Sequence, residues 1–160
     1  MVMRNPYQRK AALNATQKNN SATDQYRIFI ENIVQQGKVY ALYQDGWALC
    51  ATPSGQQTLA VWQSKSLAQL LQKGNWENYQ VEEIALIQFV EKMIPFIREN
   101  DKILSINLTP EGQNVLVSGD KFLIDLKKYL YHVQLTTPNI FKSGSVPLPR
   151  KIRLHEKVSS

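Results

Sequence analysis

The sequence predicts a single-domain α+β protein in which a mainly antiparallel sheet is covered by about four helices. Asp45-Gly46 lies between two apolar runs, and glycine tolerates the positive φ that a tight hairpin turn requires. A second turn, Thr109-Pro110-Glu111-Gly112, also separates two apolar runs. Between and around these hairpins, apolar residues recur with helical spacing. Because hairpins dominate, we do not expect an all-parallel sheet.

The helices follow from apolar spacing together with residues that cap or end a helix. Ser21 or Thr23 caps the first helix, which Gly37 ends, and Ser64 and Ser118 cap two others. Pro95 lies inside a further helical pattern, where it removes a backbone donor, so we expect a kink or a break there. The predicted helices cover residues 23–36, 65–72, 86–99 and 120–131.

The strands are predicted from short apolar runs bounded by turn residues. The first three form a meander around the Asp45-Gly46 turn, two more form the second hairpin, and one short extended piece is isolated. These strands cover residues 39–43, 47–52, 57–62, 81–84, 102–108 and 113–117.

Charge divides the chain into three parts. The net charge is +6 at pH 7, but residues 1–20 carry +4, residues 138–160 carry +4, and residues 21–137 carry −2. We therefore predict a disordered basic N-terminal extension over 1–20, a globular domain over 21–137 and a basic tail over 138–160, which contains Pro and Ser and is also disordered. On this division the high pI does not indicate a basic face on the folded domain.

Composition also indicates in which cell compartment the protein is expected. No apolar run approaches the ~20 residues of a membrane-spanning helix, and residues 1–20 have no apolar core of a secretory signal. The single cysteine, Cys50, excludes an internal disulfide and fits a reducing compartment. We expect a cytoplasmic protein with no membrane partner. Oligomeric state is left open.

Residues 26–131 resemble a bacterial family known only as domain of unknown function 2750. The resemblance covers about two-thirds of the chain in the same order, and both basic ends lie outside it. It implies no activity, because the family has no assigned function. The matching residues are Tyr26-Arg-Ile-Phe29, Val39-Tyr-Ala-Leu42, Asp45-Gly46-Trp47-Ala48, Ala60-Val-Trp62, Ala68, Gly74-Asn-Trp76, Tyr79, Ile84, Leu86, Phe89, Pro95 and Thr109-Pro110-Glu111-Gly112.

The sequence offers few residues for catalysis. His132 and His155 form no metal-ligand spacing with Cys50, and the seven glycines form no phosphate-binding loop. Cys50 lies in a predicted strand, and we interpret it as a buried, unreactive thiol. The sequence leaves a catalytic pair of Cys50 and His132 open as the alternative. Adjacent Glu82 and Glu83 point to opposite faces of an extended chain and read as solvated. We therefore predict no catalytic residue, no metal and no cofactor, and favour a protein that is not an enzyme.

Aromatic residues are the main candidates for binding. Trp76, Tyr79, Tyr40 and Tyr43 come from neighbouring strands and one loop, and Tyr and Trp are common anchors of interfaces and pockets. Alternation along residues 39–43 puts Tyr40 and Tyr43 on opposite faces. We expect Trp47 and Trp62 to pack in the core.

Two hypotheses for the function follow from the sequence, and an enzyme without a recognisable motif is a third possibility. The preferred hypothesis is a non-catalytic domain that binds another protein, because catalytic motifs are missing and aromatic residues cluster in sequence. The alternative is a binder of nucleic acid or another anionic surface through the basic tails, with weak phosphate contacts from Arg150, Lys151 and Arg153.

Overall fold

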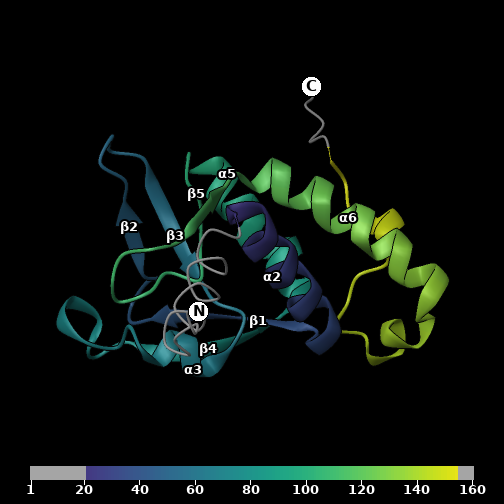
Figure 1. Cartoon of the computed structure of the whole chain (residues 1–160), viewed down its shortest axis with the longest axis horizontal. Helices are drawn as coiled ribbons and strands as arrows, with labels where there is room; N and C mark the ends of the chain where they lie inside the picture. The colour runs from purple at the N-terminus through teal and green to yellow at the C-terminus, as the bar shows by residue number, and fades with distance from the viewer. Residues whose placement is uncertain (1–20, 155–160) are drawn as a thin grey trace, which may run out of the picture.

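The structure is a computed structural model that describes residues 21–154. It confirms the predicted α+β class in one domain. The long helix α2 lies in front of the sheets and α6 runs beside it, extending away from the strands (Figure 1). Both helices contribute to the main core, and a second core is covered by shorter segments. The helices are α2 (Ala22–Gln36), α3 (Lys65–Gln69), α4 (Leu86–Gln88), α5 (Ile94–Glu99) and α6 (Gly119–Thr136), with a π-helical turn η2 (Phe89–Met93) and 3-10 turns η1 (Gly74–Trp76), η3 (Pro138–Ser143) and η4 (Pro149–Lys151).

Six strands form two sheets. The first pairs β1 (Lys38–Tyr43) with β4 (Gln80–Ala85), antiparallel. The second has the order β2-β3-β5-β6, with β2 (Leu49–Ala51), β3 (Gln57–Val61), β5 (Ile103–Ile106) and β6 (Val115–Val117). Its β2-β3 and β5-β6 pairs are the hairpins, and β3 pairs with β5 in parallel. This parallel pair was not predicted, because it depends on a crossover of about forty residues that local sequence patterns do not report.

The predicted meander of the first three strands forms only in part. Residues after the Asp45-Gly46 turn approach β1 through one bridge, Tyr43 to Trp47, whereas the full ladder of β1 is with β4. The chain bends at Ala48, whose N–H donates to the Leu42 carbonyl (2.9 Å) and whose carbonyl accepts from the Ala60 N–H (3.3 Å). β4 occupies one edge of β1 over six residues. On the other edge the segment after the turn pairs only near Tyr43, because Trp62 at the end of β3 takes the position beside Tyr40.

The predicted caps and apolar helix faces are confirmed. Ser21 and Ser118 accept hydrogen bonds from backbone amides in the first turns of α2 and α6. The buried faces of both helices meet the sheet in one core, which includes Phe29 and Ile33 of α2 and Phe122 of α6. Phe122 meets Phe89 edge-on, with ring centroids 5.5 Å apart, so α6 also packs on the helical segment 86–99.

Pro95 does not break its helix. The π-helical turn at Phe89–Met93 comes immediately before it, and the Ile94 N–H donates to the Phe89 carbonyl five residues back. A proline lacks the N–H that a regular α-helix would use, and a π-turn shifts the hydrogen-bond ladder at that point. The predicted disturbance therefore takes the form of a π-turn within a continuous helical segment.

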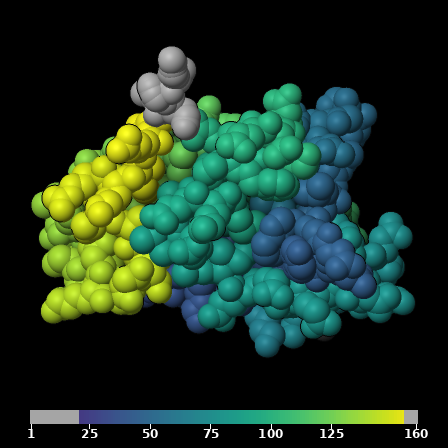
Figure 2. All heavy atoms as spheres, turned by 180° about the vertical axis from the view of Figure 1, so that it is seen from behind, coloured from purple at the N-terminus to yellow at the C-terminus, as the bar shows by residue number. Residues whose placement is uncertain are grey.

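The prediction of a disordered tail from residue 138 is wrong for residues 138–154. This segment packs along α6 on the back of the molecule (Figure 2, yellow on light green). Val146 and Ile152 are buried in the main core, and the Lys127 ammonium donates to the Ile152 carbonyl at 2.9 Å. The Ile87 N–H also donates to the Ser145 carbonyl at 2.8 Å. The prediction followed the Ser, Gly, Pro and cation content and overlooked a few well-spaced apolar anchors. Residues 1–20 and 155–160 lie outside the described part.

Ile152→Ala tests whether this segment belongs to the folded domain. Removal of a buried isoleucine side chain is expected to lower the free energy of unfolding by about 2–5 kcal/mol. Urea unfolding of the full chain measures it, with Lys151→Ala at the exposed neighbouring position as control, expected to change stability by about 0.5 kcal/mol or less. Equal stability of the two variants would contradict the packing.

Candidate functional site

A second, smaller core lies on the face of the sheet opposite α2 and α6. Trp62, at the end of β3, is fully buried in it and donates its indole N–H to the Leu108 carbonyl at 2.9 Å. Trp76 meets Trp62 edge-on, with ring centroids 6.4 Å apart, and Tyr79 lies 6.3 Å from Trp76. These contacts hold η1 and the segment after β5 against the sheet. The expectation that Trp62 is a core residue is confirmed.

The structure brings together three of the four predicted aromatic candidates. Tyr40 is only 9% exposed and, like Trp76 and Tyr79, belongs to this second core, so it offers little surface to a ligand. Tyr43 points elsewhere: it is 40% exposed, and its ring lies edge-on to Trp47 at 4.8 Å. Trp76 and Tyr79 remain half-buried. Of the four, Trp76 is the one that lines a hollow.

This hollow, which we name the β2 hollow, has a volume of about 460 Å³ and is open to solvent. One side comes from β2, another from the α3–η1 region, and a third from the turn between β5 and β6. Trp76 provides an aromatic ring, and Lys73 and Asn75 provide exposed polar groups. The lining residues are Leu49, Cys50, Leu71, Lys73, Asn75, Trp76 and Pro110. Sequence reasoning found only Trp76 as a binding candidate, because the approach of Pro110 to Cys50 is a tertiary contact.

The strand beside the β2 hollow has a free edge. β2 is an outer strand of its sheet, and among residues 21–154 the strand that pairs with it is β3 alone. The Thr52 N–H donates to Gln56 and the Ala48 carbonyl accepts from Ala60, so even-numbered residues direct their backbone groups toward β3. In an antiparallel pair this direction alternates. The N–H and C=O groups of Leu49 and Ala51 therefore point away from the sheet, toward the open edge.

Cys50 lines the hollow, but its thiol has the properties of one with low nucleophilic reactivity. It is half-buried and unpaired, and burial raises its pKa. The neighbouring Thr58 hydroxyl favours a lower pKa. The Thr58 hydroxyl is buried and forms no hydrogen bond with a described group. We therefore attribute the raised pKa of Cys50 to burial. A raised pKa reduces the thiolate fraction, which is the nucleophilic form.

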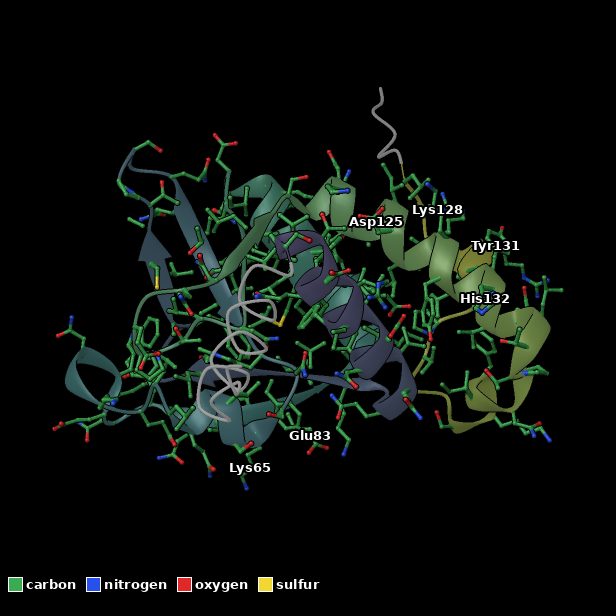
Figure 3. The ribbon with its side chains drawn as sticks, in the orientation of Figure 1. Lys65, Glu83, Asp125, Lys128, Tyr131 and His132 are labelled. Carbon is green, nitrogen blue, oxygen red and sulfur yellow. The ribbon has the colours of Figure 1, made fainter. Side chains whose placement is uncertain are left out.

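The other groups considered for chemistry are dispersed. Glu83 pairs with Lys38 at 3.1 Å and lies on the exposed side of β4, whereas His132 is on α6 at the far end of the molecule (Figure 3). The His132 ring lies 6.0 Å from that of Tyr129, and the two pack as surface rings. Among residues 21–154 no three metal-ligating side chains gather in one place. Arg150, Lys151 and Arg153 are exposed around η4 on the packed C-terminal segment.

One partly buried polar cluster was missed by the sequence reasoning. The Tyr26 hydroxyl of α2 donates to Asp125 of α6 at 2.8 Å, and Lys121 pairs with the same carboxylate at 3.0 Å. Burial raises the pKa of Tyr26 well above its usual range, and the hydrogen bond to Asp125 adds to the shift. Because α2 and α6 are nearly a hundred residues apart, only the tertiary structure reveals the pair. It fastens the two long helices to each other.

The fold and the hollow define a small single-domain α+β protein in which the outer edge of β2 lies beside a partly aromatic depression. A family model described as protein of unknown function, DUF2750, matches residues 26–126. The chain therefore belongs to this family, as the resemblance predicted. Neither the curated proteins nor the solved structures contain a match to it. Within the described residues, no helix is both long and apolar enough to cross a membrane.

The raised pKa of Tyr26 predicts a stability change in alkaline solution. The native protein keeps the phenolic proton where the unfolded chain releases it, at about pH 10. The unfolding free energy should thus be insensitive to this group below pH ~9 and fall above pH ~10, by at most about 1.4 kcal/mol per pH unit. Tyr26→Phe should remove this fall, whereas the exposed Tyr131→Phe control should keep it. Urea unfolding between neutral and alkaline pH decides, and identical pH profiles for all three chains would refute the assignment.

Proposed function

We propose that the protein is a non-catalytic binding domain that takes an extended segment of a partner protein along the open edge of β2. The free N–H and C=O groups of Leu49 and Ala51, next to the β2 hollow, carry this proposal. A strand added at a sheet edge gains its affinity from backbone hydrogen bonds and its specificity from pockets that accept alternate side chains. β2 offers the first, and the hollow offers the second.

Several properties of the hollow fit such a ligand. Leu49 is 37% exposed, so an apolar surface already lies at the edge where a peptide side chain would pack. Trp76 is held edge-on against Trp62, which limits its freedom before a ligand arrives, and pre-ordered aromatic anchors lose little entropy on binding. Lys73 and Asn75 add donors at the rim. The raised pKa of the Cys50 thiol supports binding in preference to nucleophilic chemistry in the β2 hollow.

A proline at Ala51 tests the backbone part of the proposal. Linear peptides selected from a displayed library on the full chain supply the ligand. Ala51→Pro removes the N–H that faces the open edge and leaves the bonds to β3 in place, since proline is tolerated on an edge strand. We expect peptide affinity to fall about tenfold or more, which corresponds to one lost backbone hydrogen bond. Ala51→Ser keeps the N–H and is the matched control, expected to bind within about threefold of wild type.

The side-chain part is tested at Trp76 and Cys50. Trp76→Ala should abolish capture of the same peptide, with circular dichroism checking that the fold is intact, because interface tryptophans commonly dominate binding. A bound peptide should also slow alkylation of Cys50, which lines the hollow. Equal peptide affinity of the Ala51→Pro and Ala51→Ser chains, or failure of any peptide to be enriched, would refute the proposal.

A further inference from the structure

The described part of the chain is electrically polarised along its length. Residues 121–154 contain seven Lys and Arg and one acid, whereas residues 21–120 contain seven Lys and Arg and eleven acids. The first of these stretches comprises most of α6 and the segment packed on it. The sequence had suggested that the cations near the C-terminus lie on a separate tail. Because the segment folds back, these cations are added to those of α6 on one body.

The C-terminal segment is anchored so that its cations face outward. Pro149 and Ile152 are buried, and the intervening Arg150 and Lys151 are exposed, as is Arg153. The hydrogen bond from Lys127 to the Ile152 carbonyl fixes this turn beside α6. Three cations of the segment are thereby held next to the outer side of the helix.

The outer side of α6 carries an apolar stripe with a cation in it. Residues 124, 128, 131 and 135 recur at four, three and four positions, which is the spacing of one helical face. Ile124 is 41% exposed, Tyr131 47% and Leu135 85%, and Lys128 lies between them on the same face. Figure 3 shows Lys128 and Tyr131 on the side of α6 away from α2. Large apolar side chains exposed in a row indicate a contact surface.

The two acids of α6 are already engaged elsewhere. Asp120 pairs with Arg98 at 3.0 Å. Asp125 accepts a hydrogen bond from Tyr26 of α2 and pairs with Lys121 of α6 itself. By contrast, in the described structure Lys127, Lys128, Arg150, Lys151 and Arg153 form no ion pair. We name these five cations, together with Ile124, Tyr131 and Leu135, the α6 face. None of its residues lines the β2 hollow.

Although no membrane partner was expected from the sequence, we propose that the α6 face binds the surface of an anionic lipid bilayer. A helix with cations beside an exposed apolar stripe suits an interface in which side chains enter the headgroup region and cations meet lipid phosphates and carboxylates. The face follows the outer side of a helix and the turn beside it, and it lines none of the four hollows described for the molecule. An amphipathic helix of another protein would be expected to sit in a groove. Nucleic acid would use the cations and leave Ile124 and Leu135 without an apolar partner.

Co-sedimentation of the full chain with vesicles tests this proposal. Vesicles made of equal parts phosphatidylcholine and phosphatidylserine should retain the protein at physiological salt, and vesicles of phosphatidylcholine alone should not. Lys128→Gln/Lys151→Gln should weaken binding roughly 30-fold, since each cation near the surface contributes about a tenfold or smaller factor. Lys65→Gln/Lys92→Gln makes the same change in charge at exposed sites off this face, with Lys65 on α3 (Figure 3), and should change binding about threefold or less.

Leu135→Ser tests the apolar part, with Leu116→Ser on β6 as its matched control, since both leucines are exposed. Only Leu135→Ser should weaken binding to the anionic vesicles. Three results would overturn the proposal: no retention on anionic vesicles, equal losses in the two lysine pairs, or equal binding of the two leucine variants. Binding to a mixed-sequence DNA duplex without binding to vesicles would also overturn it, and would assign the cations to nucleic acid.

Discussion

Trp62 is the residue on which the arrangement of both sheets depends. Its backbone exchanges two hydrogen bonds with Tyr40, at 2.8 and 2.9 Å, and this bridge joins the β1–β4 pair directly to β3, beside the hydrogen bonds that Ala48 forms with Leu42 and Ala60. Its indole N–H holds the segment after β5 through Leu108, and its ring receives Trp76. A buried indole that lost its acceptor would carry an unsatisfied donor, so the Leu108 contact is required rather than incidental. The backbone and side chain of one residue therefore contact three segments that no local pattern connects.

The elements of this fold were largely predictable, whereas their partners were not. The faces of α2 and α6 and their serine caps follow from local rules, because a helix satisfies its own backbone and needs only one apolar side. The backbone groups of a strand form their hydrogen bonds with another strand, so its pairing depends on distant segments. Thus β1 was correctly placed at residues 39–43 but assigned to the wrong main partner, and the parallel contact of β3 with β5 was not foreseen. The same reasoning explains the C-terminal segment: composition indicated disorder, but Val146 and Ile152 are enough to anchor it.

The candidate site shows the same division. Trp76 was named from the sequence because a tryptophan in a loop is conspicuous, and Tyr40 was named for the same reason although it packs inside. Residue type alone does not separate these two cases. The separation comes from their places in the fold: Tyr40 lies within β1 and is 9% exposed, whereas Trp76 lies in η1 and is half-buried beside the hollow. Leu49 and Pro110 carried no sequence signal, since their role arises only when the turn between β5 and β6 reaches β2.

The two surfaces differ in how firmly the fold holds them, and this bears on what each can bind. The β2 hollow is built from a strand edge, a turn and an aromatic ring that all depend on the second core around Trp62. Its shape is therefore set before binding, which suits a ligand recognised by backbone geometry. The α6 face consists mainly of long, solvated cations and three exposed apolar side chains on one helix. Such a surface has little shape of its own, and it gains affinity from the number of charges and the apolar area, as a planar anionic surface would require. The β2 hollow would select its ligand by shape, and the α6 face would select its ligand by charge. The two sites therefore need not compete for the same class of partner.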